Sequence, residues 1–142
     1  ACPIPNPFGY MQLDSDGTAT VDETNLGAGS TVTNIVSDSN YISWNDTNKY
    51  FMVSAAGTYE CLGVVILEGG STLATLTVQK NGSDVLVGAP RVHSSVDPLE
   101  HTIRAVFTAS SGDNISITYD AVAASNTLKP LTGSTMTVKR LA

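Results

Sequence analysis

Apolar and polar residues alternate in short runs from Gly57 to the end of the chain, with turn signals between the runs. The clearest run is 115–119, in which every second side chain is apolar. A period of two residues is typical of a β-strand with one buried face and one face in water. The longest run, 58–67, has apolar residues on both faces near its end, which indicates a strand covered on two sides. The pattern predicts an all-β, antiparallel β-sandwich.

Turn signals separate the expected strands. Asn81-Gly82 is the strongest short hairpin signal in the chain, because both residues tolerate positive φ. Residues 14–50 are more polar and contain weaker strand signals. No long helical pattern interrupts the sequence. The expected strands are therefore 18–21, 31–36, 41–44, 49–53, 58–67, 74–79, 85–87, 103–108, 115–119 and 136–139.

The start of the chain differs from the rest, because three prolines in the first seven positions precede Phe8 and Tyr10. Proline removes backbone donors and favours extended backbone, so this stretch is expected to be neither helix nor central strand. We expect 1–13 to form a Pro-rich N-terminal arm and 14–142 to form the folded domain. Apolar residues on such an arm need cover. The arm either folds back on its own domain or reaches a neighbouring subunit or another protein.

Four short segments follow one another in a recognisable order: Ala56-Gly57-Thr58-Tyr59, Gln79-Lys80-Asn81-Gly82, 111–117 and 133–138. In order and spacing they resemble the jelly roll shared by the complement globular head and tumour necrosis factor. The resemblance covers about residues 44–142. It implies two five-stranded antiparallel sheets, assembly as a compact homotrimer around a three-fold axis, and no catalytic residues. It also implies that Tyr59 and Tyr119 pack toward that axis as trimer-interface residues.

Free-standing jelly rolls of this size also resemble the decoration, or cement, proteins of tailed bacteriophages and the tips of phage fibres. This resemblance implies a homotrimeric virion protein bound to the major capsid protein on the outer surface of the head, which it stabilises. Ile4, Phe8 and Tyr10 are the expected capsid-attachment residues. Such a protein would be made in the host cytoplasm. The chain begins with Ala and shows no charged-then-apolar leader, which agrees with that expectation.

Charge argues against two classes of partner. The 142-residue chain has a net charge of −6 and a pI near 4.5, and its seven Lys and Arg residues are scattered. Nucleic acids and anionic membranes both attract clustered cations, so neither is an expected partner. No apolar run approaches the length that spans a bilayer. An acidic, hydroxyl-rich exterior suits a particle that must stay dispersed.

Candidate catalytic and metal chemistry is sparse. His93 and His101 lie in or beside the 89–101 loop, and no Gly-x-Ser-x-Gly segment accompanies them, so a hydrolase is not expected. Two histidines eight residues apart and two cysteines 59 apart do not have zinc-ligand spacing. We therefore expect no enzyme activity, no cofactor and no bound metal.

The segment around Asp14 and Asp16 partly matches a calcium loop, with Gly17 and Glu23 at the sixth and twelfth positions. The first position would be Gln12, and no helix precedes it. An Asp-Gly turn explains the same residues, so calcium stays the less favoured alternative.

The two cysteines, Cys2 and Cys61, are too few for a disulfide framework. Cys61 lies within the 58–67 run, where we expect a small buried apolar residue. A bridge to Cys2, or between chains, stays open.

Aromatic residues cluster at Tyr41, Trp44, Tyr50 and Phe51. Stacking on such rings is one way in which jelly-roll lectins hold sugars, which makes Trp44 a candidate glycan contact. Packing in the core or at a trimer interface explains the cluster more simply. The alternative function is therefore a carbohydrate- or receptor-binding fibre tip of the same fold.

Overall fold

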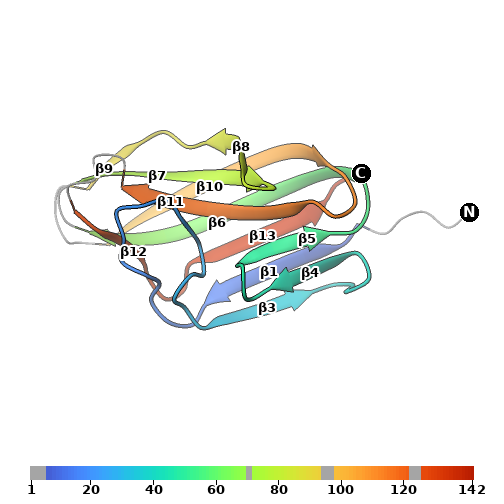
Figure 1. Ribbon diagram of the computed structural model, residues 1–142, viewed down its shortest axis with the longest axis horizontal. Helices are drawn as coiled ribbons and strands as arrows, with labels where there is room; N and C mark the ends of the chain where they lie inside the picture. The colour runs from blue at the N-terminus through green and yellow to red at the C-terminus, as the bar shows by residue number, and fades with distance from the viewer. Residues whose placement is uncertain (1–5, 70–71, 94–97, 122–125) are drawn as a thin grey trace, which may run out of the picture.

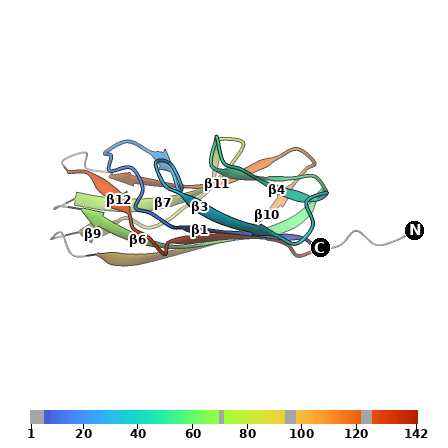
Figure 2. The same ribbon diagram turned by 90° about the horizontal axis from the view of Figure 1, so that it is seen from below.

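The computed structural model describes residues 6–69, 72–93, 98–121 and 126–142. These residues form two antiparallel β-sheets stacked face to face, and Figures 1 and 2 show the two layers from directions 90° apart. None of the described residues is helical, so the expectation of an all-β sandwich is confirmed. Within the described ranges, no helix has the length and apolar character needed to cross a membrane.

One layer, sheet A, has five strands in its main path and a sixth strand, β12 (Leu128–Pro130), paired with β6. Its spatial order is β10 (Leu99–Ala109), β6 (Gly57–Gly69), β13 (Thr135–Arg140), β1 (Phe8–Leu13) and β3 (Val32–Val36).

The other layer, sheet B, also has a five-stranded path. Two short strands pair along it, β2 (Thr24–Asn25) with β11 and β9 (Arg91–His93) with β7. The spatial order is β4 (Ile42–Asn45), β5 (Tyr50–Val53), β11 (Asn114–Ala121), β7 (Thr72–Lys80) and β8 (Ser83–Val87).

Strand β6 shows how sequence alternation builds the core. Tyr59, Cys61, Val65 and Leu67 are fully buried, whereas the residues between them are half-exposed on the outer face of sheet A. Gly63 occupies an inward position because the two sheets approach closely there. A Cβ at Gly63 would lie 2.4 Å from Ile117 Cδ1 of the facing sheet.

The Asn81-Gly82 hairpin forms where the sequence predicts it, between β7 and β8. Both residues have positive φ, 53° and 78°. The Asn81 side chain also ties this turn to the turn before β11, since its Nδ2 donates to Asp113 Oδ1 at 2.8 Å and its Oδ1 accepts from Asn114 N at 2.8 Å. One residue therefore links the β7–β8 hairpin to the turn that joins β10 of sheet A to β11 of sheet B.

The N-terminal boundary predicted from the prolines is wrong. Strand β1 lies inside sheet A, between β13 and β3, with Met11 opposite both Met136 and Asn34. Met11 and Leu13 are fully buried. The prolines end at Pro7, and the residues after it alternate between core and surface, which is what a sheet strand requires. Only 1–5 of the expected arm lies outside the described residues.

Candidate functional site

The outer face of sheet A, which points away from the core, carries apolar side chains in solvent. Phe8 is 42% exposed, Ile35 56% and Val106 50%. Half-exposed apolar residues of β1 and β6 lie on the same face between them. We call this set the outer apolar band; it consists of Phe8, Tyr10, Ile35, Leu62, Val64, Ile66 and Val106.

One carboxylate, that of Glu60, lies beside the band on β6, with its side chain only 12% exposed. Arg104 Nε donates to Glu60 Oε2 at 2.8 Å, and Lys139 Nζ lies 3.7 Å from Glu60 Oε1. Arg104 and Lys139 come from the strands on either side of β6. The charge of Glu60 is therefore compensated in place, whereas Glu100 of β10 is exposed on the same face opposite Ile66.

The two tyrosines assigned to a trimer interface belong to the protomer core, which corrects that assignment. Tyr59 and Tyr119 are both 0% exposed. Tyr59 donates its hydroxyl to Ala55 O at 2.6 Å, and Tyr119 donates to Thr18 O at 2.7 Å. Burial raises the pKa of both phenols, that of Tyr119 to about 12. A side chain covered by its own chain offers no surface to a second copy.

The expected attachment residues are only partly described. Phe8 and Tyr10 lie on the outer apolar band, on a strand of the sheet and not on a free arm. Tyr10 donates its hydroxyl to Gln12 Oε1 at 3.1 Å on the same face. Ile4 lies outside the described residues.

Trp44, the candidate glycan contact, packs at the edge of the core. Its ring centroid is 4.8 Å from that of the buried Phe51, at an interplanar angle of 60°. Its Nε1 donates to Asp46 Oδ1 at 3.1 Å, and Lys49 Nζ donates to the same oxygen at 2.9 Å. The Lys49 hydrogen bond, followed by that of Trp44, holds the pKa of Asp46 below its usual value. These contacts account for Trp44 by packing, while sugar binding there stays a prediction.

Asp14 and Asp16, the candidate calcium ligands, bind different partners in the structure. Asp16 Oδ1 accepts from the backbone N and the Oγ1 of Thr132 at 3.0 and 3.1 Å, and Lys129 Nζ lies 3.6 Å from its Oδ2. The Thr132 backbone hydrogen bond is the main cause that lowers the pKa of Asp16. Asp14 instead accepts from the Thr33 hydroxyl. The two carboxylates therefore fasten different parts of the loop.

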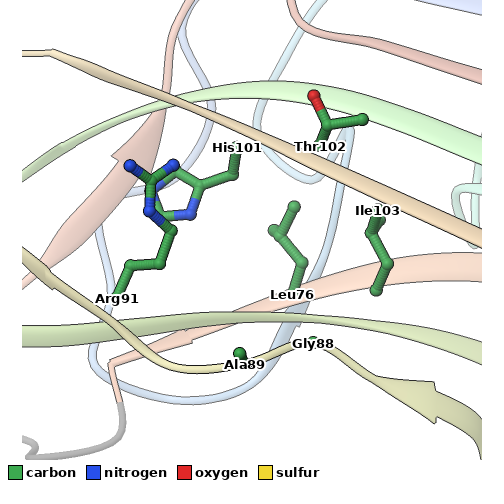
Figure 3. A pocket seen from close by; sticks show the side chains of 7 residues that line it. All are labelled: Leu76, Gly88, Ala89, Arg91, His101, Thr102 and Ile103. Atoms are coloured by element: carbon green, nitrogen blue, oxygen red, sulfur yellow. The ribbon is translucent and has the colours of Figure 1, made fainter.

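A hollow of about 180 Å³ opens between the edge of sheet A and sheet B, and Figure 3 shows the residues that line it. Apolar side chains form part of its wall, and Arg91 and the buried His101 form the polar part. Arg91 Nη1 donates to Glu100 O at 2.8 Å. The lining residues are Leu76, Gly88, Ala89, Arg91, His101, Thr102 and Ile103.

Cys61 is a buried free thiol, as the strand pattern predicts. Burial is the main cause that raises its pKa, and the nearby Glu60 charge acts in the same direction. A thiol that stays protonated is a weak nucleophile and a poor metal ligand. Among the residues that the structure describes, no three His, Cys, Asp or Glu side chains group together as metal ligands. Cys2 and its pairing lie outside the described residues.

Two comparisons with known proteins found nothing: no family model matches the sequence, and no curated protein does. Solved structures do match in three dimensions. Eiger TNF from S. frugiperda superposes with a TM-score of 0.67 at 8% identity, covering 98% of this chain and 94% of that one. Murine APRIL superposes with a TM-score of 0.70 at 15% identity, covering 96% of this chain and 100% of that one. The chain therefore has the tumour-necrosis-factor-like jelly-roll fold, and at these identities the likeness is one of fold.

Proposed function

We propose that the protein is a homotrimeric structural component of a virion, a decoration protein that binds the outer surface of the capsid and stabilises it. The observation that supports self-association most directly is the outer apolar band. Three of its side chains are more than 40% exposed on one sheet face. The band has two parts, one on β1 and β3 and one on β6 and β10, with Thr135, Thr137 and Lys139 of β13 between them on the same face. Exposed apolar side chains gathered on one face of a small domain are typical of a protein contact.

A three-fold assembly needs two different surfaces on each copy, because a cyclic trimer is built from heterologous contacts. The outer apolar band supplies one surface. The second lies at the side of the sandwich where the end strands of the two sheets, β8 and β10, contact each other. Leu86 and Val87 of β8 are 41% and 54% exposed there. Packing this edge on the β6 and β10 part of the band of the next copy would cover apolar surface on both copies and the unpaired edge of β8, and would leave Phe8 and Tyr10 of β1 for the capsid.

The trimer is tested by mass in solution. We expect about 44 kDa by sedimentation equilibrium, three times the 14.8-kDa chain. Ile35→Asp with Val106→Asp should give a folded species of one-chain mass, because a charge in the band cannot be covered without cost. Met52→Asp is the matched control, since Met52 is 38% exposed on β5 of the other sheet. A wild-type chain that stays monomeric at high concentration would refute the trimer.

We assign capsid attachment to Ile4, Phe8 and Tyr10. Because Phe8 and Tyr10 belong to β1, the test must leave this strand in place. Deleting residues 1–12 would remove a strand of sheet A, so the informative truncation stops at residue 5. The measurement is co-sedimentation with capsids of the parent virion. We expect the full chain to pellet with them and the truncated chain to stay in the supernatant. Equal binding by both forms removes the arm from the mechanism, and no binding by either refutes the capsid role.

The second candidate is a carbohydrate- or receptor-binding module of the same fold. The aromatic cluster around Trp44 is the feature behind it, because the indole and two neighbouring phenols, Tyr41 and Tyr50, are half-exposed. A glycan array probed with the intact protein tests this function. Binding that disappears in Trp44→Ala, with the mass in solution unchanged, would favour the module over the decoration protein.

A further inference from the structure

A row of polar side chains crosses the outer face of sheet B, opposite to the outer apolar band. It runs from the segment before β2, over β11 and β7, to β8. Although these side chains point away from the core, those on the two middle strands are almost fully covered. Thr77 is 3% exposed, Gln79 7%, Ser116 6% and Thr118 2%.

Two carboxylates converge on one amide in this row. Gln79 Nε2 donates to Glu23 Oε1 at 2.9 Å and to Asp84 Oδ1 at 2.9 Å. Asp84 stands opposite Gln79 on β8, whereas Glu23 comes from the segment that leads into β2. The amide nitrogen therefore lies where two negative charges meet, and it offers each of them one hydrogen bond but no full positive charge.

Thr118 supplies an independent sign of a ligand. Its Oγ1 is buried and has no hydrogen-bond partner in the described part of the chain. β2 and β7 flank β11 on opposite sides, and Thr118 is paired with Asn25 on one side and Thr77 on the other. The hydrogen bond from Gln79 to Glu23 must therefore cross the face of β11 where Thr118 stands. Asp84 lies farther off, on β8 beyond β7, so Thr118 is beneath the Glu23 side of this cluster. A buried hydroxyl without a partner there is an oxygen available to a cation.

We propose that Glu23, Gln79, Asp84 and Thr118 bind a calcium ion on this face. Two carboxylates match the charge of a divalent cation, and rotation of the Gln79 amide presents its Oε1 in place of Nε2. With the Thr118 hydroxyl, the donor set is entirely oxygen, which is the set that calcium takes. Calcium fits better than magnesium, because exposed carboxylates on separate segments of the chain suit a flexible coordination sphere. With only two charged ligands, a dissociation constant of about 10⁻⁴–10⁻³ M is expected.

This site is independent of the Asp14 and Asp16 segment, whose carboxylates have other partners. It does not rest on the proposed virion role: the outer apolar band lies on sheet A, and although β8 carries Asp84 close to Leu86 and Val87, none of the four ligands is assigned to the trimer contact. The inference therefore stands or falls without the trimer or the capsid.

Thermal unfolding of the full chain in CaCl₂, with MgCl₂ and NaCl at matched ionic strength, tests the proposal. Calcium tenfold above its Kd should raise Tm by about 5 °C, and above Kd the rise should grow with the logarithm of the calcium concentration. Glu23→Gln and Asp84→Asn should each weaken the response about tenfold or more. Glu100→Gln, which changes an exposed carboxylate on sheet A, should leave it intact. No calcium shift, an equal shift in NaCl, or an unchanged response in both ligand variants would each overturn the site.

Thr118→Val separates coordination from a structural role. Valine has the same shape without the unsatisfied hydroxyl, so the variant should have a higher Tm than wild type in EDTA. The same change removes a ligand, so its calcium-induced rise in Tm should be smaller. A Thr118→Val protein that responds to calcium as fully as wild type would refute the assignment of this residue.

Discussion

Removing the hydroxyl of Tyr119 tests how the core is held together. Relative to phenylalanine, this hydroxyl should stabilise the folded chain at neutral pH and destabilise it at alkaline pH. It donates to Thr18 O at 2.7 Å and so ties β11 to the 14–31 segment. In Tyr119→Phe the ring still fills its place in the core, and only this hydrogen bond is lost. A hydrogen bond of this kind contributes about 1 kcal/mol net. We expect the variant to be less stable by that amount at pH 8.

The stability difference between wild type and Tyr119→Phe should change sign as the pH rises. The pKa of Tyr119 is raised from 10.0 to about 12 in the folded chain, chiefly by burial. Between these two values the unfolded chain has released the phenolic proton and the folded chain still holds it, so wild-type stability falls with pH. A shift of two units corresponds to at most about 2.7 kcal/mol. Because the hydrogen-bond partner, Thr18, is exposed at the surface, we expect a smaller loss of about 1–2 kcal/mol.

Urea unfolding measures both effects, with the fluorescence of the single tryptophan as the probe. Wild type and Tyr119→Phe are compared at equal chain concentration at pH 8, 9, 10, 11 and 11.5. The advantage of wild type at pH 8 should shrink above pH 10 and vanish or reverse by pH 11.5. Other groups that titrate in this range are common to both proteins and cancel in the difference. A difference that stays constant from pH 8 to 11.5 would refute the reasoning.

Three further predictions concern the core and the turns. Gly63→Ala places a methyl 2.4 Å from Ile117 Cδ1 and should destabilise the protein by about 1–3 kcal/mol in urea unfolding, so an unchanged midpoint would contradict the close approach of the sheets. Asn81→Ala loses two side-chain hydrogen bonds and also strains a positive φ, whereas Asn81→Gly loses only the hydrogen bonds. Alanine should therefore lower Tm more than glycine does, and the reverse order would contradict this account. In a Cys2→Ser background, the Cys61 thiol should react with a thiol reagent at pH 8 only after denaturation, because burial keeps it protonated and covered. Rapid labelling of Cys61 in the folded protein would contradict this prediction.

Local patterns predicted most of the strands correctly. Alternation over 58–67 and 115–119 corresponds to β6 and β11, and Asn81-Gly82 is a hairpin with both φ angles positive. The weaker signals at 31–36 and 41–44 correspond to β3 and β4. The signal at 18–21 produced only an isolated bridge at Thr20. A two-residue segment such as β2 is too short for any periodicity to reveal.

The candidate site was harder to predict than the strands. The burial of Tyr59 and Tyr119 follows from which face of β6 and β11 meets the other sheet, and resemblance to a trimeric family did not reveal it. Glu23, Gln79, Asp84 and Thr118 were not singled out as a group, because they come from separate segments and form no linear motif. Among the band residues, Ile35 and Val106 are ordinary strand residues until their sheet face is known.

The amino-acid sequence alone determined the chain's local character: extended backbone, two-faced strands, tight Gly-containing turns and an acidic exterior. Those properties depend on each residue and its near neighbours. Only the tertiary structure decided that Phe8–Leu13 is an inner strand of a sheet and that Glu23 meets Gln79 over Thr118. A strand's sequence specifies its two faces but not the strands beside it, because those pairings are made by hydrogen bonds between backbone groups that all residues share.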